Sequence, residues 1–172
     1  MNEPKMNVLL YMDQSQSAFF ATVYSAMLLM NMPNMHLTVV QLKESNDGLS
    51  TDWLKNVIVE SDSASENRNV EILNTVNDIF SQRATDVRHR VVYCNPSIPD
   101  AVDAILEYAA KNSIELIVMG TKKSTTLKRL IFGSLPHTLQ CRSPIPVLLV
   151  EKLPQNFLDS YRSKPMLQVV RK

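Results

Sequence analysis

The chain of 172 residues contains only three glycines, far below the average share of about 7%. Its two cysteines, Cys94 and Cys141, are too few for a disulfide framework. No apolar run approaches the roughly 20 residues of a membrane helix, and a net charge of +1 gives no general reason to expect nucleic acid as a partner. The first residues lack the apolar stretch of a signal peptide. We therefore expect a cytoplasmic protein that binds neither nucleic acid nor membranes.

Two common phosphate-binding signatures are also missing. There is no G-x-G-x-x-G after the first apolar run and no G-x-x-x-x-G-K-[ST] anywhere in the chain. A dinucleotide-dependent dehydrogenase and a P-loop phosphotransferase are therefore poor interpretations of this sequence.

Apolar strands alternate with helical segments along the chain. Buried strands are predicted at residues 6–12, 36–42, 87–93, 114–119 and 145–150, and helices at 18–32, at 70–83, from 99 and from about 134. This alternation predicts an α/β fold with a parallel sheet covered on both faces. We expect one domain at residues 1–150 with a polar insert at about 43–69, followed by a C-terminal extension at 151–172.

Two of the three glycines flank one basic loop between the fourth predicted strand and the next helix. The loop leaves the strand at Gly120, where a missing Cβ would let a ligand approach the backbone. It enters the helix at Gly133-Ser134, where free amides and the helix dipole favour a phosphate. Lys122 and Lys123 lie on the loop, and residues 116–150 contain no Asp or Glu. The alternative is that Gly120 eases a turn, Ser134 caps the helix and the lysines face water.

From residue 6 to residue 150 the sequence resembles the universal stress protein family. The resemblance is carried by VLLYMD at 8–13, LIVMG at 116–120, Gly133-Ser134 and PIPVLLV at 144–150. Nucleotide-binding members have the pattern G-x2-G-x9-G-[ST] between the fourth strand and the following helix. Gly120, Gly133 and Ser134 match this spacing, whereas Lys123 stands at the position of the middle glycine.

The resemblance implies a three-layer α/β/α sandwich of the adenine nucleotide α-hydrolase type, with a five-stranded parallel sheet in the order 3-2-1-4-5. It implies a stress-response regulatory domain that binds ATP or a related adenine nucleotide, with or without Mg²⁺, and that forms a homodimer through the strand at 145–150. The family's nucleotide-binding residues correspond to Asp13 near the base and ribose, Val40 or Gln41 at the adenine, and Met119 and Gly120 at the ribose and phosphates. At the phosphates they correspond to Gly133, Ser134 and the amide of Leu135. The basic loop adds Lys122 and Lys123 to these candidate site residues.

Three functions remain open at this point: a nucleotide-binding regulatory domain, a partner-binding protein of the same fold, and a slow ATPase. Lys123 either weakens the phosphate site, because a lysine disfavours the backbone that a glycine allows, or contributes its charge to it. If it closes the site, the protein is a partner-binding member of the same fold that binds no nucleotide. A slow ATPase is the third alternative, but no residue is an obvious base for water and no carboxylate cluster is evident for Mg²⁺. His36, His89 and His137 are too scattered for a metal site, so we predict no catalytic and no metal-binding residues.

Overall fold

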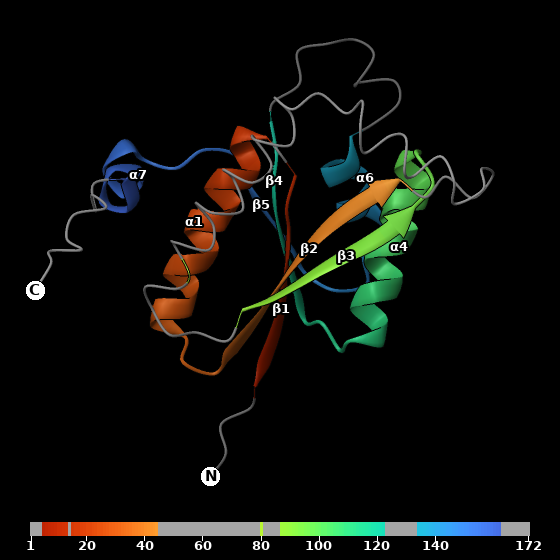
Figure 1. Cartoon of the computed structure of the whole chain (residues 1–172), viewed down its shortest axis with the longest axis horizontal. Helices are drawn as coiled ribbons and strands as arrows, with labels where there is room; N and C mark the ends of the chain where they lie inside the picture. The colour runs from red at the N-terminus through yellow and green to blue at the C-terminus, as the bar shows by residue number, and fades with distance from the viewer. Residues whose placement is uncertain (1–4, 14, 45–79, 81–86, 123–133, 163–172) are drawn as a thin grey trace, which may run out of the picture.

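The computed structural model describes residues 5–13, 15–44, 80, 87–122 and 134–162. The described helices and strands alternate along the chain except that β3 follows β2 (Figure 1). Their bounds are β1 (Met6–Tyr11), α1 (Gln16–Asn31), β2 (Met35–Glu44), β3 (Arg88–Cys94), α4 (Ile98–Lys111), β4 (Leu116–Gly120), α6 (Leu135–Arg142), β5 (Val147–Val150) and α7 (Gln155–Arg162).

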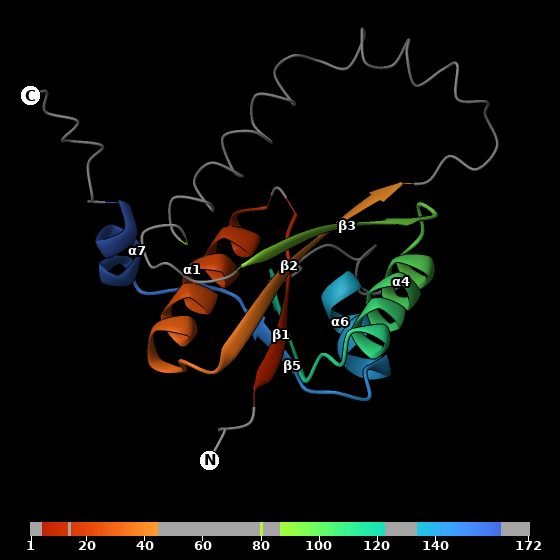
Figure 2. The same cartoon turned by 60° about the horizontal axis from the view of Figure 1, so that its bottom comes forward.

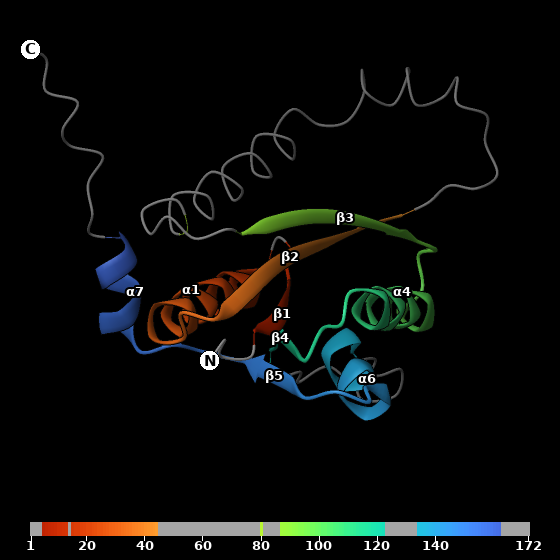
Figure 3. The ribbon, with the colours of Figure 1, turned by 90° about the horizontal axis from the view of Figure 1, so that it is seen from below.

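The five strands form one parallel sheet in the order β3-β2-β1-β4-β5, which confirms the predicted fold class and strand order. Figure 2 shows β3 and β5 at its two edges. Helices α1 and α7 lie on one side of the sheet and α4 and α6 on the other (Figure 3). Because all strands run the same way, their carboxyl ends meet at one edge, where open sheets of this kind bind ligands.

The continuous apolar run of β1 places it at the centre of the sheet. Val8, Leu9 and Leu10 are each 0% exposed, as expected for a strand that is covered on both faces. Successive side chains point to opposite faces. Val8 and Leu10 therefore join the core under α1, and Leu9 joins the core under α4 and α6.

Helix α1 is buried around most of its circumference, which is why its polar residues bond within the helix. The Ser15 hydroxyl caps it by accepting a hydrogen bond from the Ala18 amide at 3.1 Å. The hydroxyls of Thr22 and Ser25, both 0% exposed, donate to backbone carbonyls one turn earlier at 2.8 Å. Burial of these two hydroxyls therefore leaves no unpaired donor.

Several predicted boundaries differ from the observed ones. Strand β2 runs to Glu44, so the first two residues assigned to the polar insert belong to the sheet. Strand β5 begins at Val147 rather than at residue 145, because Pro146 has no N–H to donate to the ladder. The rest of the insert and the helix predicted at 70–83 lie outside the described residues, apart from Phe80, which is helical and buried.

The C-terminal extension contributes to the core. Leu153 and Leu158 are 7% and 4% exposed and belong to the same apolar cluster as α1. Helix α7 thus packs beside α1 (Figure 3). Within the described residues, none of the helices has both the length and the apolar character needed to cross a membrane.

Candidate functional site

A cavity of about 300 Å³ lies at the carboxyl ends of β1, β2 and β3, where α4 and α6 begin. Apolar and aromatic side chains line it together with a few polar groups. The lining residues are Tyr11, Leu42, Lys43, Cys94, Asn95, Pro96, Ser97, Ile98, Ala101 and Leu135. This volume is at the small end of the range for ligand pockets, which extends from about 300 Å³ to about 1,000 Å³.

Two helices point their N-terminal ends at this edge of the sheet. The Ser97 hydroxyl caps α4 by accepting from the Asp100 amide at 3.1 Å, and it donates to the Asp100 carboxylate at 2.6 Å. The Ser134 hydroxyl caps α6 by accepting from the His137 amide at 3.4 Å. The positive ends of both helix dipoles are therefore directed at the cavity edge, which favours a negatively charged group.

Tyr11 contributes the aromatic ring of the cavity wall. Burial raises the pKa of its phenol to about 12, and the charges of Asp13 and Cys94 act in the same direction. The phenol therefore stays protonated at neutral pH, so Tyr11 offers the cavity both an O–H donor and its aromatic ring.

Asp13 follows β1 and lies at the start of α1. Its side chain is exposed, and its Oδ1 accepts a hydrogen bond from the Ser15 amide at 2.8 Å. Asp13 thus shapes the turn into α1 and also places a carboxylate next to the cavity residue Tyr11.

The residues predicted at the adenine and ribose lie beneath the cavity more than in its wall. Val40 and Met119 are both 0% exposed and belong to the core under α4 and α6. The Val40 carbonyl accepts from the Met12 amide at 2.9 Å, while Gln41 is half-buried. Leu42, two residues after Val40 on the same face, lines the cavity itself.

Position 120 requires a glycine for a packing reason that was not evident from the sequence. A Cβ at this position would lie 2.2 Å from the Ser17 carbonyl carbon, 2.3 Å from its oxygen and 2.5 Å from the Ala18 nitrogen. The first turn of α1 therefore occupies the space that a side chain would need. The missing Cβ thus makes room for this helix, and the role of Gly120 at a ligand stays a prediction.

The family model described as "Universal stress protein family" matches residues 6–151. The chain belongs to this family. A crystal structure of a universal stress protein in complex with cAMP is 26% identical, with a TM-score of 0.63 over 86% of this chain and 98% of that one. A universal stress protein family protein from Arabidopsis thaliana with AMP bound is 10% identical, with a TM-score of 0.53 over 88% and 94% of the two chains; at that identity the likeness shows the fold alone.

A shorter match links the chain to a protein named for stress response. The stress response protein NhaX of Bacillus subtilis (strain 168) is 42% identical over 52 residues, which is 30% of this chain and 31% of that protein. The match thus covers about a third of the relative's length. The family model over residues 6–151 therefore remains the basis of the assignment to the universal stress protein family.

Within this universal stress protein fold, the structure brings only some of the predicted site residues to the cavity. Leu135 lines it, Ser134 caps the adjoining helix, and Lys122 is exposed just beyond β4. Lys123 and Gly133 lie outside the described residues. Their roles, like those of the other site residues, stay predictions.

Most residues of the cavity wall were not predicted from the sequence. Tyr11 ends β1, Leu42 lies two residues before the end of β2, and Asn95 follows β3. That position was the available signal, since carboxyl ends of parallel strands gather at one edge. In the described part of the chain, no three His, Cys, Asp or Glu residues are grouped so as to hold a metal ion.

Proposed function

We propose that this universal stress protein domain binds an adenine nucleotide in the cavity at the carboxyl ends of β1, β2 and β3. The observation that carries the proposal is the meeting of an aromatic and aliphatic cavity with two helix N-termini at one edge of the sheet. A planar base binds in an apolar cavity, and a phosphate binds at helix N-termini. The cAMP complex of the 26% identical universal stress protein supports this choice of ligand.

The base would lie against Tyr11, Leu42 and Ile98, whose side chains line one cavity. The protonated Tyr11 phenol is suited to donate a hydrogen bond to a ring nitrogen or a ribose oxygen. The phosphates would extend towards the Leu135 amide at the start of α6 and towards Lys43. Pro136 in the first turn of α6 has no N–H, so Leu135 is the amide best placed for this contact.

A cavity of about 300 Å³ has room for the base and part of the ribose rather than for a whole nucleotide. The phosphates therefore lie outside it, at the edge of the sheet where α6 begins. The adenine end should consequently supply most of the discrimination, and AMP, cAMP and ATP should share the same base site.

The test uses the matched substitutions Ala101→Phe and Ala110→Phe on the same helix. Ala101 lines the cavity, whereas Ala110 is exposed near the other end of α4. A phenyl group at 101 fills the space of the base and should abolish binding of AMP, cAMP and ATP measured by isothermal titration calorimetry. The same group at 110 should leave binding unchanged, because it projects into solvent.

Circular dichroism and thermal melting show whether both variants keep the fold. Wild-type protein that gives no heat with any of the three nucleotides at millimolar concentration contradicts the proposal. Binding that survives Ala101→Phe places the nucleotide elsewhere and contradicts it equally.

We also infer a homodimer that pairs through β5. This strand is an edge of the sheet, and an uncovered apolar edge favours pairing with its own copy. The Pro146 carbonyl accepts from the Ile117 amide of β4 at 3.0 Å, and the Val150 carbonyl accepts from the Thr121 amide just after β4 at 2.9 Å. The backbone groups of Val147 and Leu149 therefore point outward. Val147→Pro removes one outward N–H at the first residue of the strand, where proline is tolerated. Sedimentation velocity should then show a dimer for the wild type and a monomer for this variant, and an unchanged dimer would contradict pairing through β5.

A further inference from the structure

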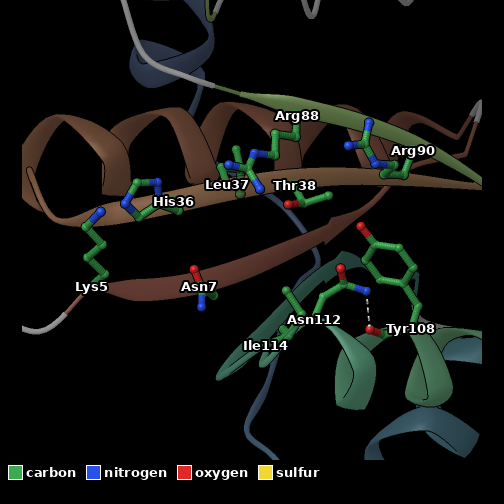
Figure 4. Close-up of a pocket in the computed structure, with 10 residues that line it drawn as sticks. All are labelled: Lys5, Asn7, His36, Leu37, Thr38, Arg88, Arg90, Tyr108, Asn112 and Ile114. Carbon is green, nitrogen blue, oxygen red and sulfur yellow. Dashed lines mark hydrogen bonds between the residues drawn. The ribbon is translucent and has the colours of Figure 1, made fainter.

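A second cavity, of about 220 Å³, lies at the opposite, amino-terminal edge of the sheet (Figure 4). Its floor is formed by the starts of β1 and β2, and its walls by β3 and the C-terminal part of α4. The lining residues are Lys5, Asn7, His36, Leu37, Thr38, Arg88, Arg90, Tyr108, Asn112 and Ile114. Only Leu37 and Ile114 among them are aliphatic.

The sheet is polar here on a face that is apolar further along the same strands. Asn7 pairs with His36, and Thr38 pairs with Arg88. These positions share a face with Leu9, which is buried in the core under α4 and α6. Arg88 and Arg90 are exposed on the edge strand β3, whereas Asn7 and His36 are half-buried, so these polar side chains border a cavity that is open to solvent.

The cavity is also strongly basic. Lys5, Arg88 and Arg90 line it, and no lining residue is acidic. The carboxylate of Glu115 lies nearby, where it accepts from the Asn7 amide at 3.0 Å, but it does not belong to the lining. Among the described residues, none of these three cations forms an ion pair with a carboxylate. The concentration of positive charge is therefore not neutralised by the described part of the chain.

The arrangement of the donors matches a small, multiply charged anion. Arg88 and Arg90 stand two residues apart on β3, so both side chains leave the same face of the strand. Figure 4 shows them above the cavity, with the Tyr108 hydroxyl directed towards Arg90 and with Thr38 on β2 beside it. Arg90 Nη1 also donates a hydrogen bond to the His89 carbonyl at 2.9 Å. The Asn112 amide nitrogen donates to the Tyr108 carbonyl at 2.8 Å, which holds that part of the wall in place.

We infer that this cavity binds a small phosphate-bearing anion, of the size and charge of a pyrophosphate or a small phosphorylated metabolite. Guanidinium groups bind phosphate oxygens in pairs, and the hydroxyls of Thr38 and Tyr108 supply neutral donors beside them. A volume of about 220 Å³ leaves no room for the helical backbone of a nucleic acid. The site is separate from the proposed nucleotide cavity and does not depend on it, since the two lie at opposite ends of the strands.

The test is the binding of inorganic pyrophosphate to the full chain, followed by calorimetry at an ionic strength of about 0.15 M, where the Debye length is about 8 Å. The double variant Arg88→Gln/Arg90→Gln should weaken binding roughly tenfold or more, because hydrogen bonds to charged groups are among the strongest in proteins. The matched control Arg142→Gln/Lys152→Gln removes the same charge from exposed positions outside the cavity. This control should keep the wild-type affinity to within about twofold, since surface charges beyond the Debye length are screened.

Two further measurements identify the site. Pyrophosphate should shift the imidazole resonances of His36 in the wild-type protein, which keeps the proposal testable even if the arginine variant does not fold. The variant Ala101→Phe should retain pyrophosphate binding, and Arg88→Gln/Arg90→Gln should retain AMP binding. Pyrophosphate binding that is lost in Ala101→Phe but intact in the arginine variant assigns the anion to the nucleotide site and overturns the inference. No binding to the wild type, or an equal loss in the surface control, overturns it as well.

Discussion

Replacing Gly120 by alanine tests how the end of β4 and the start of α1 fit together. The new Cβ would lie 2.2 Å from the Ser17 carbonyl carbon and 2.5 Å from the Ala18 nitrogen. The closest contact is about 1.2 Å short of the 3.4 Å at which ordinary van der Waals contact begins. All three nearest atoms belong to the backbone, so no side chain can rotate away. The first turn of α1 must therefore move.

The size of the effect follows from two opposing contributions. An alanine restricts the unfolded chain and by that effect alone would stabilise the protein by about 0.4–1 kcal/mol. Overpacking a core costs typically about 1–3 kcal/mol, and occasionally more. Because the contacted atoms are backbone, we expect a value at the upper end, a net loss of about 3 kcal/mol. For a chain of this size that corresponds to a fall in Tm of about 6–12 °C.

Urea unfolding followed by circular dichroism measures this change in the free energy of unfolding. The double variant Ser17→Gly/Gly120→Ala is the control, because removing the Ser17 side chain leaves its backbone in place. It should therefore recover none of the loss. An unchanged or increased stability in Gly120→Ala would refute the reasoning, and so would full recovery in the double variant, since that would show that the conflict involves the Ser17 side chain.

Three further predictions concern the rest of the described structure. Absorbance at alkaline pH should show Tyr11 ionising near pH 12, and Asp13→Asn should lower this pKa. Because an ordinary phenol ionises near pH 10, the stability that the buried Tyr11 phenol contributes is complete below about pH 10 and is lost as the pH rises towards 12. Leu158→Ala should reduce the free energy of unfolding by about 2–5 kcal/mol because Leu158 is 4% exposed within the core under α1, and a loss below about 0.5 kcal/mol would show that α7 does not belong to the cooperative unit. Arg142→Ala should cost no more than about 1 kcal/mol in urea unfolding, since its ion pair with Asp103 between α6 and α4 is well exposed; a larger loss would mean that the pair holds the two helices together.

Much of the fold could be predicted because each strand carries its own signal. The apolar run of β1 and the branched residues of β2 indicated buried strands, and their alternation with helices indicated a parallel sheet. The strand order came from the resemblance to the universal stress protein family, and the structure confirms it. Exact bounds were less accessible, because the extension of β2 to Glu44 depends on pairing with Cys94 of β3, a partner 50 residues further along the chain.

The candidate site could be predicted in its location but not in its wall. Ser134 and Leu135 were recognisable, because a glycine-serine pair before a helix has a local capping and anion-binding signal. Tyr11 and Leu42 were not, since from the sequence they are ordinary members of apolar strands. Only the register of the sheet shows that their side chains extend past the core and into a cavity.

The sequence by itself determined the class of the fold, the edge of the sheet where a ligand would bind, and the helix caps, because strand and helix periods, turn residues and caps are properties of neighbouring residues. The tertiary structure decided which atoms fill the space beside Gly120, which residues line the two cavities, and that Leu158 joins the core. These depend on contacts between segments far apart in the chain. Gly120 shows the difference. The scarcity of glycine in the chain marked this residue as important, but only the packing of α1 against β4 shows that the missing Cβ makes room for a helix.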